Sequence, residues 1–340
     1  MRQIAVIALA TTLAGPAWAG AKDKKLDIYW IDVEGGAATL IVTPAGESVL
    51  IDAGNPGGRD PQRIHKVATE VAGLKQIDHL VVTHLHRDHY GGVAELAALM
   101  PVGTLYENGI DTAPESERKN EAVTAFKTAK VGKRVAVKVG EKLPVAGVTL
   151  IVRGARKEFD HGIDASKGRK NPACSGAKPK EEDKSDNANS VVLSLEYKGW
   201  KFFDGGDLTW NMEEKLACPT TVLPEVDVFQ STHHGLDLSN NPVLVRALHP
   251  KVAVFNNGPK KGCMPEPFAT LKAIPGIEAV YQMHKNLVAP DANTTPEKIA
   301  NLDEKCAGNY LKLSVEPSGK KYTVYNPSTK HEKTYTTKGS

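Results

Sequence analysis

The chain has 340 residues, 41% of them hydrophobic and 24% charged, with a formal net charge of +3 at pH 7. This length is ample for a sizeable core and could form one large domain or two of ordinary size. The near-neutral charge gives no general argument for nucleic-acid binding, which typically accompanies a strongly basic chain.

The first residues have the pattern of a secretory signal peptide. Arg2 gives a positive start, Ile4 to Leu13 is apolar, and Ala17-Trp18-Ala19 places small residues at both cleavage-defining positions. We expect cleavage after Ala19 and a secreted or periplasmic mature protein, with the loss of Arg2 lowering the charge from +3 to +2. The apolar run is shorter than the roughly 20 residues that span a bilayer, and no later stretch is long and apolar enough.

The four cysteines are scattered rather than arranged in Cys-x-x-Cys pairs, which makes a zinc knuckle a poor interpretation. In an oxidising compartment they are expected to form two disulfides, and the sequence allows three pairings. Proximity along the chain favours Cys174 with Cys218 and Cys263 with Cys306.

Periodicity predicts short strands first and then alternating strands and helices. This order favours an α/β fold in which two facing sheets lie between outer helices, as a single domain over residues 20–340. Strands are expected at 26–33, 37–42, 48–52, 77–82, near 105, 135–139, 148–152, 226–231 and 252–255, hairpins at 190–203 and 310–325, and helices at 61–74, 93–100 and 117–130.

The most informative run is His84-Leu85-His86-Arg87-Asp88-His89, directly after the apolar stretch Ile77 to Val82. Three imidazoles and one carboxylate in six residues suit Zn²⁺, and a strand that ends in a tight loop can aim alternate side chains at one point. His84 and His86 share one face while Asp88 and His89 turn toward a second position, which predicts two metals. The alternative is a solvated loop, but four such side chains would desolvate or repel one another without a cation.

Two later loops also place ligand-type side chains at strand ends. Asp207 follows the apolar Phe202-Phe203 and two glycines, although alone it would be read as a turn or cap residue before a helix. His233 and His234 follow the strand predicted at 226–231, and a histidine pair at a third such strand end favours a functional role. One of the two is expected to complete the second half-site.

The pattern His-x-His-x-Asp-His followed by Gly91-Gly92 resembles the signature of the metallo-β-lactamase superfamily of di-metal hydrolases. This resemblance implies an αββα sandwich and a bridging role for Asp207. Within the superfamily, the chain resembles the hydrolase domain of ComEC-type competence proteins in its fragments Ile31 to Ala37, Leu50 to Gly54, Asn187 to Leu193, Gly206 to Leu208, His233 to Gly235 and Asn256 to Gly258.

Two departures from these patterns affect the expected ligand set. ComEC-type proteins usually have aspartate where this chain has His86, so the set is closer to that of ordinary di-zinc hydrolases. The superfamily's third-motif histidine is missing, and Asn187 or Asn189, whose amides are weak zinc ligands, stands in that region. His161 could substitute, although an exposed loop histidine is the simpler interpretation.

The expected roles follow from this ligand set. His84 and His86 hold one zinc ion, and Asp88, His89 and either His233 or His234 hold the other. Asp207 lies between the ions, and the second histidine of the pair binds substrate or protonates the leaving group. Asp52 either orients a ligand from behind or is a plain turn residue.

Two zinc ions can share a water and lower its pKa from about 15.7 toward about 7, which makes a bridging hydroxide the expected nucleophile. We expect hydrolysis of phosphodiesters or other anionic substrates. The alternatives are a lactone, β-lactam or other cyclic ester or amide hydrolase, and a metal-binding protein with little catalysis. Nucleic acid as a partner and the oligomeric state stay open.

A polar insertion at 153–187 is expected near the mouth of this site. Between Arg153 and Lys180 it has eight lysines and arginines against three acidic residues. The excess could draw anions toward the site or could be an ordinary solvated surface.

Overall fold

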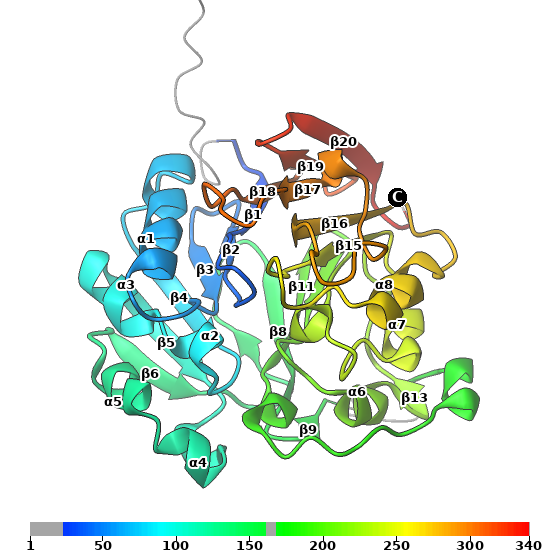
Figure 1. Ribbon diagram of the computed structural model, residues 1–340, viewed down its shortest axis with the longest axis horizontal. Helices are drawn as coiled ribbons and strands as arrows, with labels where there is room; N and C mark the ends of the chain where they lie inside the picture. Colours follow the sequence, from blue (N-terminus) through cyan, green and yellow to red (C-terminus); the bar gives the residue numbers. More distant parts are fainter. Residues whose placement is uncertain (1–22, 161–167, 340) are drawn as a thin grey trace, which may run out of the picture.

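The computed structural model describes residues 23–160 and 168–339. It has four layers, because two β-sheets face each other and helices cover the outer side of each sheet (Figure 1). The predicted signal peptide, residues 1–19, and His161 lie outside the described residues. Among the helices that the structure does describe, none has the length and hydropathy needed to cross a bilayer.

The first sheet has nine strands in the order β20-β19-β18-β1-β2-β3-β4-β5-β6. Neighbours from β20 to β3 pair antiparallel, and those from β3 to β6 pair parallel. The strands are β1 (Leu26–Trp30), β2 (Thr39–Val42), β3 (Ser48–Ile51), β4 (Ile77–Val82), β5 (Val102–Glu107), β6 (Lys133–Ala136), β18 (Leu311–Val315), β19 (Lys321–Asn326) and β20 (His331–Thr336).

The second sheet has the order β17-β16-β15-β14-β12-β11-β8-β7, with β9 paired to β8. It is antiparallel around β8 and β11 and parallel from β12 to β17. Its strands are β7 (Lys142–Leu143), β8 (Thr149–Ala155), β9 (Glu158–Phe159), β11 (Val192–Tyr197), β12 (Trp200–Asp204), β14 (Val228–Gln230), β15 (Val252–Phe255), β16 (Ala279–His284) and β17 (Ile299–Asn301), while β10 (Arg169–Lys170) and β13 (Thr220–Thr221) form a separate ribbon.

Helices cover both outer faces and give each sheet its own apolar cluster. Beside the first sheet lie α1 (Arg59–Lys66), α2 (Arg87–Tyr90), α3 (Val93–Leu99), α4 (Glu115–Arg118) and α5 (Glu121–Thr128), and beside the second lie α6 (Trp210–Ala217), α7 (Pro242–Leu248) and α8 (Pro265–Lys272).

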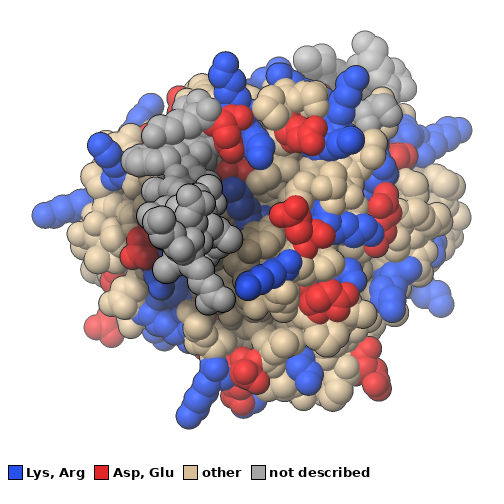
Figure 2. All heavy atoms as spheres, turned by 90° about the horizontal axis from the view of Figure 1, so that it is seen from above, with Lys and Arg blue, Asp and Glu red and all other residues tan. Residues whose placement is uncertain are grey.

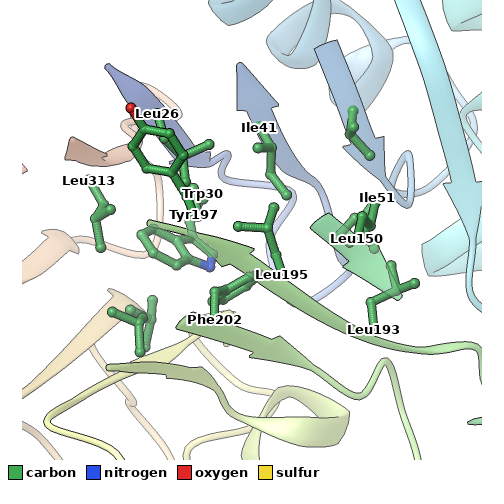
Figure 3. Packing of buried hydrophobic residues seen from close by; sticks show 14 of the residues in the cluster. Leu26, Trp30, Ile41, Ile51, Leu150, Leu193, Leu195, Tyr197, Phe202 and Leu313 are labelled. Atoms are coloured by element: carbon green, nitrogen blue, oxygen red, sulfur yellow. The ribbon is translucent and has the colours of Figure 1, made fainter. Parts of the chain in front are cut away.

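A third apolar cluster fills the space between the sheets, because alternate strand residues point inward from both. Trp30 and Ile41 lie across from Leu195 and Phe202 (Figure 3). A buried amide links the two sheets across this core, since Trp30 Nε1 donates to Gln230 Oε1 at 2.7 Å. Thr39 Oγ1 donates to the same oxygen at 2.7 Å, so Gln230 ties β1 and β2 of the first sheet to β14 of the second.

Most predicted elements lie within a few residues of the observed ones, and the strands at 77–82 and 252–255 match to the residue. The helix expected at 61–74 is instead α1 followed by a π-helical turn at Val67–Val71. The helix expected at 117–130 is two short helices, because the Asn120 side chain accepts a hydrogen bond from Ala122 N and starts α5 anew.

Three arginines in the described parts of the basic insertion make contacts within the protein. Arg153 Nη1 pairs with Asp160 Oδ2 at 2.7 Å, and Arg156 donates to the carbonyls of Asn108 and Val137 at 2.9 Å. Arg169 donates to the carbonyl of Ala247 at 2.6 Å. These side chains therefore serve intramolecular contacts, and acidic and basic residues are interspersed over the face seen in Figure 2.

One of the two favoured disulfides is present, between Cys174 and Cys218. The pairing of Cys263 with Cys306 is wrong. Cys263 is buried on the side of the second sheet, where its thiol donates to the carbonyl of Ala292 at 3.3 Å. Cys306 lies by contrast beside Asp32, which follows β1 of the first sheet, and its thiol donates to Asp32 Oδ2 at 3.1 Å. Closeness in sequence failed because Cys263 lies in the apolar cluster of the second sheet, whereas Cys306 contacts Asp32 after β1.

The Cys174–Cys218 bridge closes a loop with a sequence separation of 44 residues. We expect the double substitution Cys174→Ser, Cys218→Ser to lower the free energy of unfolding by about 4 kcal/mol, because the unfolded chain gains loop entropy. Denaturant unfolding measures this change. A reductant should destabilise the wild type and leave the double variant unaffected, and an equal response of both proteins would contradict the prediction.

Candidate metal centre

The candidate ligands come together because the two sheets present strand ends at one edge of the molecule. Asp52 follows β3 and the 84–89 motif follows β4, and these two strands run parallel. In the second sheet Asp207 follows β12 and the His233-His234 pair follows β14, again in parallel. Carboxyl ends of parallel strands meet at one edge, where ligand sites of such folds lie.

Two overlapping groups of ligand atoms result. His84, His89 and Asp207 form the first, and Asp88, His89 and His234 form the second. Within each group the donor atoms lie within 4.8 Å of one another, which is the separation expected of ligands that share one ion. His89 belongs to both groups, so the two positions are adjacent.

Asp207 lies at the centre of the arrangement. Its Oδ2 is 3.2 Å from His89 Nε2, 3.3 Å from His234 Nε2, 3.6 Å from His233 Nε2 and 3.9 Å from His84 Nε2. Burial opposes ionisation of this carboxyl, but His234 and His89 hold the pKa of Asp207 well below its usual range. Asp207 is therefore an anion in a buried site.

The backbone conformation of Gly206 brings Asp207 close to the motif loop. Gly206, which precedes it, has φ +54, and a Cβ there would lie 2.9 Å from Thr83 Cβ. Only glycine fits this approach between the loop after β12 and the motif loop after β4.

Three histidines present Nε2 to the centre because an oxygen acceptor holds Nδ1 of each. Asp52 Oδ2 accepts from His89 Nδ1 at 2.7 Å, and the carbonyl of Asn256 accepts from His234 Nδ1 at 3.3 Å. Thr83 Oγ1 donates to Asp52 and lies 3.0 Å from His84 Nδ1, so it accepts from that ring. This tautomer leaves the Nε2 lone pairs for a metal, and Asp52 thereby orients His89.

The surroundings of His84 and His89 also fit a divalent ion. His84 Nε2 is buried without a hydrogen-bond partner, which is costly unless a cation fills the space. Burial, reinforced by His89, keeps the pKa of His84 well below its usual range, so its imidazole is neutral. Burial also opposes protonation of His89, yet Asp207, Asp52 and Asp88 hold its pKa well above the usual value. A pocket that stabilises a charged imidazole also stabilises a metal cation.

His86 stands apart from both groups. Its side chain is 27% exposed, and its Nε2 lies 3.2 Å from Glu117 Oε1 rather than toward Asp207. The ring of His86 packs edge-on against that of His84 at 4.6 Å between centroids. His86 is therefore beside the first group and not part of it.

The region of the missing third-motif histidine contains a buried amide. Asn187 Nδ2 lies 3.5 Å from His233 Nε2, and Asn187 Oδ1 has no hydrogen-bond partner. Asn189 is different, because its Nδ2 donates to Asp186 Oδ1 and to the carbonyl of Thr112. Asn187 thus offers a free oxygen, whereas the Asn189 amide braces the fold.

The histidine pair lies in a constrained turn. His233 and His234 have φ of 52 and 55, which puts their side chains on different neighbours. His234 faces Asp88 and Asp207, while His233 Nδ1 lies 3.3 Å from Ser239 Oγ. Burial lowers the pKa of His233 to about 4, so this ring is neutral at pH 7.

Sequence reasoning missed three residues around the centre. Asp186 Oδ2 accepts from Leu85 N at 2.7 Å and fixes the motif loop, and Glu117 accepts from Asp186 N at 3.1 Å. Lys261 pairs with Asp88. Asp186 adjoins the Asn187 fragment and could have been suspected, but Glu117 and Lys261 lie in segments without a ligand pattern.

A second cluster of ligand-type residues lies away from the motif, comprising Asp32, His284 and Cys306. The Asp32 carboxylate already has hydrogen-bond donors around it. Asp32 accepts from His284 Nε2 at 2.7 Å, from Arg63 Nη1 at 2.9 Å and from Glu34 N at 2.9 Å. We interpret the cluster as a structural contact between β16 and the end of β1, since the Arg63 guanidinium already neutralises the Asp32 carboxylate.

Comparison with known proteins agrees with this geometry. Residues 31–169 match the family model "Metallo-beta-lactamase superfamily", a stretch that contains the motif loop and ends before Asp207. A UPF0173 metal-dependent hydrolase of Polynucleobacter asymbioticus is 34% identical over 98 residues. That alignment covers 27% of this chain and 33% of the relative, so the chain spans about a third of the curated relative it matches.

Among solved structures, the chain is similar to the metallo-beta-lactamase fold protein YhfI from Bacillus subtilis, with 11% identity and a TM-score of 0.45 over 76% of this chain and 96% of that one. It is also similar to MEM-A1, a subclass B3 metallo-beta-lactamase from a soil metagenome library, with 16% identity and a TM-score of 0.34 over 61% of this chain and 76% of that one.

Residues 31–169 thus resemble the metallo-β-lactamase superfamily. The predicted fold class is confirmed, since its two large mixed sheets between outer helices are those of the metallo-β-lactamase fold.

Removal of the Asp52 carboxylate should weaken metal binding. In Asp52→Asn the amide can present an N–H to His89 Nδ1, which disfavours the tautomer that points a lone pair at the centre. We expect zinc affinity to fall roughly 10- to 100-fold, measured by competition with a chromophoric chelator. His79→Ala is the matched control, because His79 lies on β4 and pairs with Glu47 instead. Equal zinc affinity of Asp52→Asn and wild type would contradict the role.

Proposed function

We propose that this protein is an exported di-zinc hydrolase that acts on phosphodiesters or other anionic substrates. The observation that carries the proposal is the convergence of His84, His89, His234 and Asp88 around the Asp207 carboxylate, as two overlapping ligand groups. Imidazole nitrogen and carboxylate oxygen are donors that zinc accepts, and the curated relative is itself described as a metal-dependent hydrolase.

Zinc bound at these positions would activate water as a nucleophile and neutralise charge on the reacting oxygen. The chain's own residues do the rest. Asp52 and Thr83 hold the imidazoles in the tautomer that binds metal, and Asp186 anchors the motif loop through Leu85 N. We assign substrate hydrogen bonding to the neutral His233, whose Nε2 lies 3.6 Å from Asp207 Oδ2.

Export is supported by the Cys174–Cys218 disulfide, since such bridges persist in oxidising compartments. The preference for anionic substrates is supported by the ComEC-type sequence fragments and by Lys261 beside the centre. A metal centre alone does not select a substrate, so the choice between phosphodiesters and cyclic esters or amides needs direct assay.

Metal removal and substrate screening test the proposal together. Purified, metal-analysed protein should hydrolyse bis(p-nitrophenyl) phosphate, lose that activity to a chelator and regain it with zinc. Nitrocefin and a homoserine lactone are the comparison substrates. Hydrolysis of nitrocefin alone would overturn the phosphodiester assignment, and the absence of any zinc-restored turnover would favour a metal-binding protein.

His86→Ala should abolish turnover and leave the fold intact. The side chain is partly exposed and outside the apolar core, so its loss costs little stability. The ring lies against His84, however, and is expected to complete the first zinc position on loading. Activity assays check the loss of turnover, and circular dichroism checks the fold. His79→Ala, on strand β4 directly before the motif loop, is the control. Full activity of His86→Ala would refute this ligand.

A further inference from the structure

The loop that follows β15 carries a lysine into the metal centre. Gly258 N donates to the carbonyl of Lys261 at 2.8 Å, and Cys263 N donates to the carbonyl of His234 at 2.8 Å. Gly262 has φ +82, and a Cβ there would lie 2.1 Å from His234 O. The backbone of Lys261 is therefore fixed to the same turn that positions His234.

The ammonium of Lys261 pairs with Asp88 Oδ2. That oxygen is also 3.4 Å from His234 Nε2 and 3.7 Å from His89 Nε2, so it is the carboxylate oxygen of the second ligand group. Lys261 is 39% exposed and can swing toward solvent on its flexible stem. The neighbouring Lys260 points elsewhere, because it pairs with Glu304.

We propose that Lys261 and a divalent cation bind Asp88 in exchange, and that the displaced ammonium then binds the anionic group of the substrate. Two cations on one carboxylate oxygen repel each other, and a lysine has the mobility to leave while the loop backbone stays in place. Because the backbone of Lys261 is fixed beside His234, the displaced ammonium stays within reach of an anion bound to that ion. This inference rests on the proposed function and assigns its substrate selectivity to one side chain.

Zinc binding to the metal-depleted protein tests the exchange without any turnover. Lys261→Met keeps the apolar stem and removes the competing charge. The zinc ion that binds with the lower affinity should therefore bind about tenfold more tightly than in wild type. Lys261→Arg should stay near wild type. Lys260→Met is the matched control, because Lys260 is an adjacent, 65% exposed lysine that contacts no ligand.

Binding of inorganic phosphate to the zinc-loaded proteins, measured by calorimetry, tests the second half. Lys261→Met should bind phosphate about tenfold more weakly, and Lys260→Met should bind it as wild type does. The inference is overturned if Lys261→Met leaves either zinc or phosphate affinity unchanged while circular dichroism shows a native fold. Failure of the proposed function is distinguished separately, as the absence of turnover in a wild type that still binds zinc and phosphate.

Discussion

The Asp207 carboxylate is the group on which the centre depends. It comes from the second sheet, yet it lies 3.2 Å from His89 of the first sheet and 3.3 Å from His234 of its own. Buried anions are stable only when cations or donors surround them, and here imidazoles from two separate sheets do so. The two sheets therefore form one site rather than two adjacent edges.

The second requirement is that each imidazole points its lone pair inward. Asp52, Thr83 and the Asn256 carbonyl each accept from an Nδ1, and none of the three faces the centre. The metal-binding capacity of the histidines thus resides in residues behind them as well as in the histidines themselves. The Lys261 contact with Asp88 adds a mobile charge to an otherwise rigid frame.

The sequence was sufficient for whatever depends on local pattern. The β4 strand and its ligand loop are contiguous, so apolar periodicity followed by donor side chains predicted both. The sequence was insufficient where the outcome depends on long-range packing. The thiols of Cys263 and Cys306 have different hydrogen-bond acceptors, and Glu117 and Lys261 reach the centre from segments with no ligand pattern. His86 shows the same limit, since its spacing with His84 does not determine its rotamer.

The polar contacts of Gln230 contribute to the alignment of the two sheets. This side chain accepts from Trp30 and Thr39 across the core and donates from Nε2 to Asp204 Oδ2 at 2.9 Å, and Asp204 Oδ1 accepts from Gly206 N at 2.9 Å. Hydrogen bonds depend on donor–acceptor distance and angle, so these contacts restrict how far one sheet can shift relative to the other. Gln230 thus connects the bond between the sheets to the turn that carries Asp207, so a change at this buried amide would also disturb the position of Asp207.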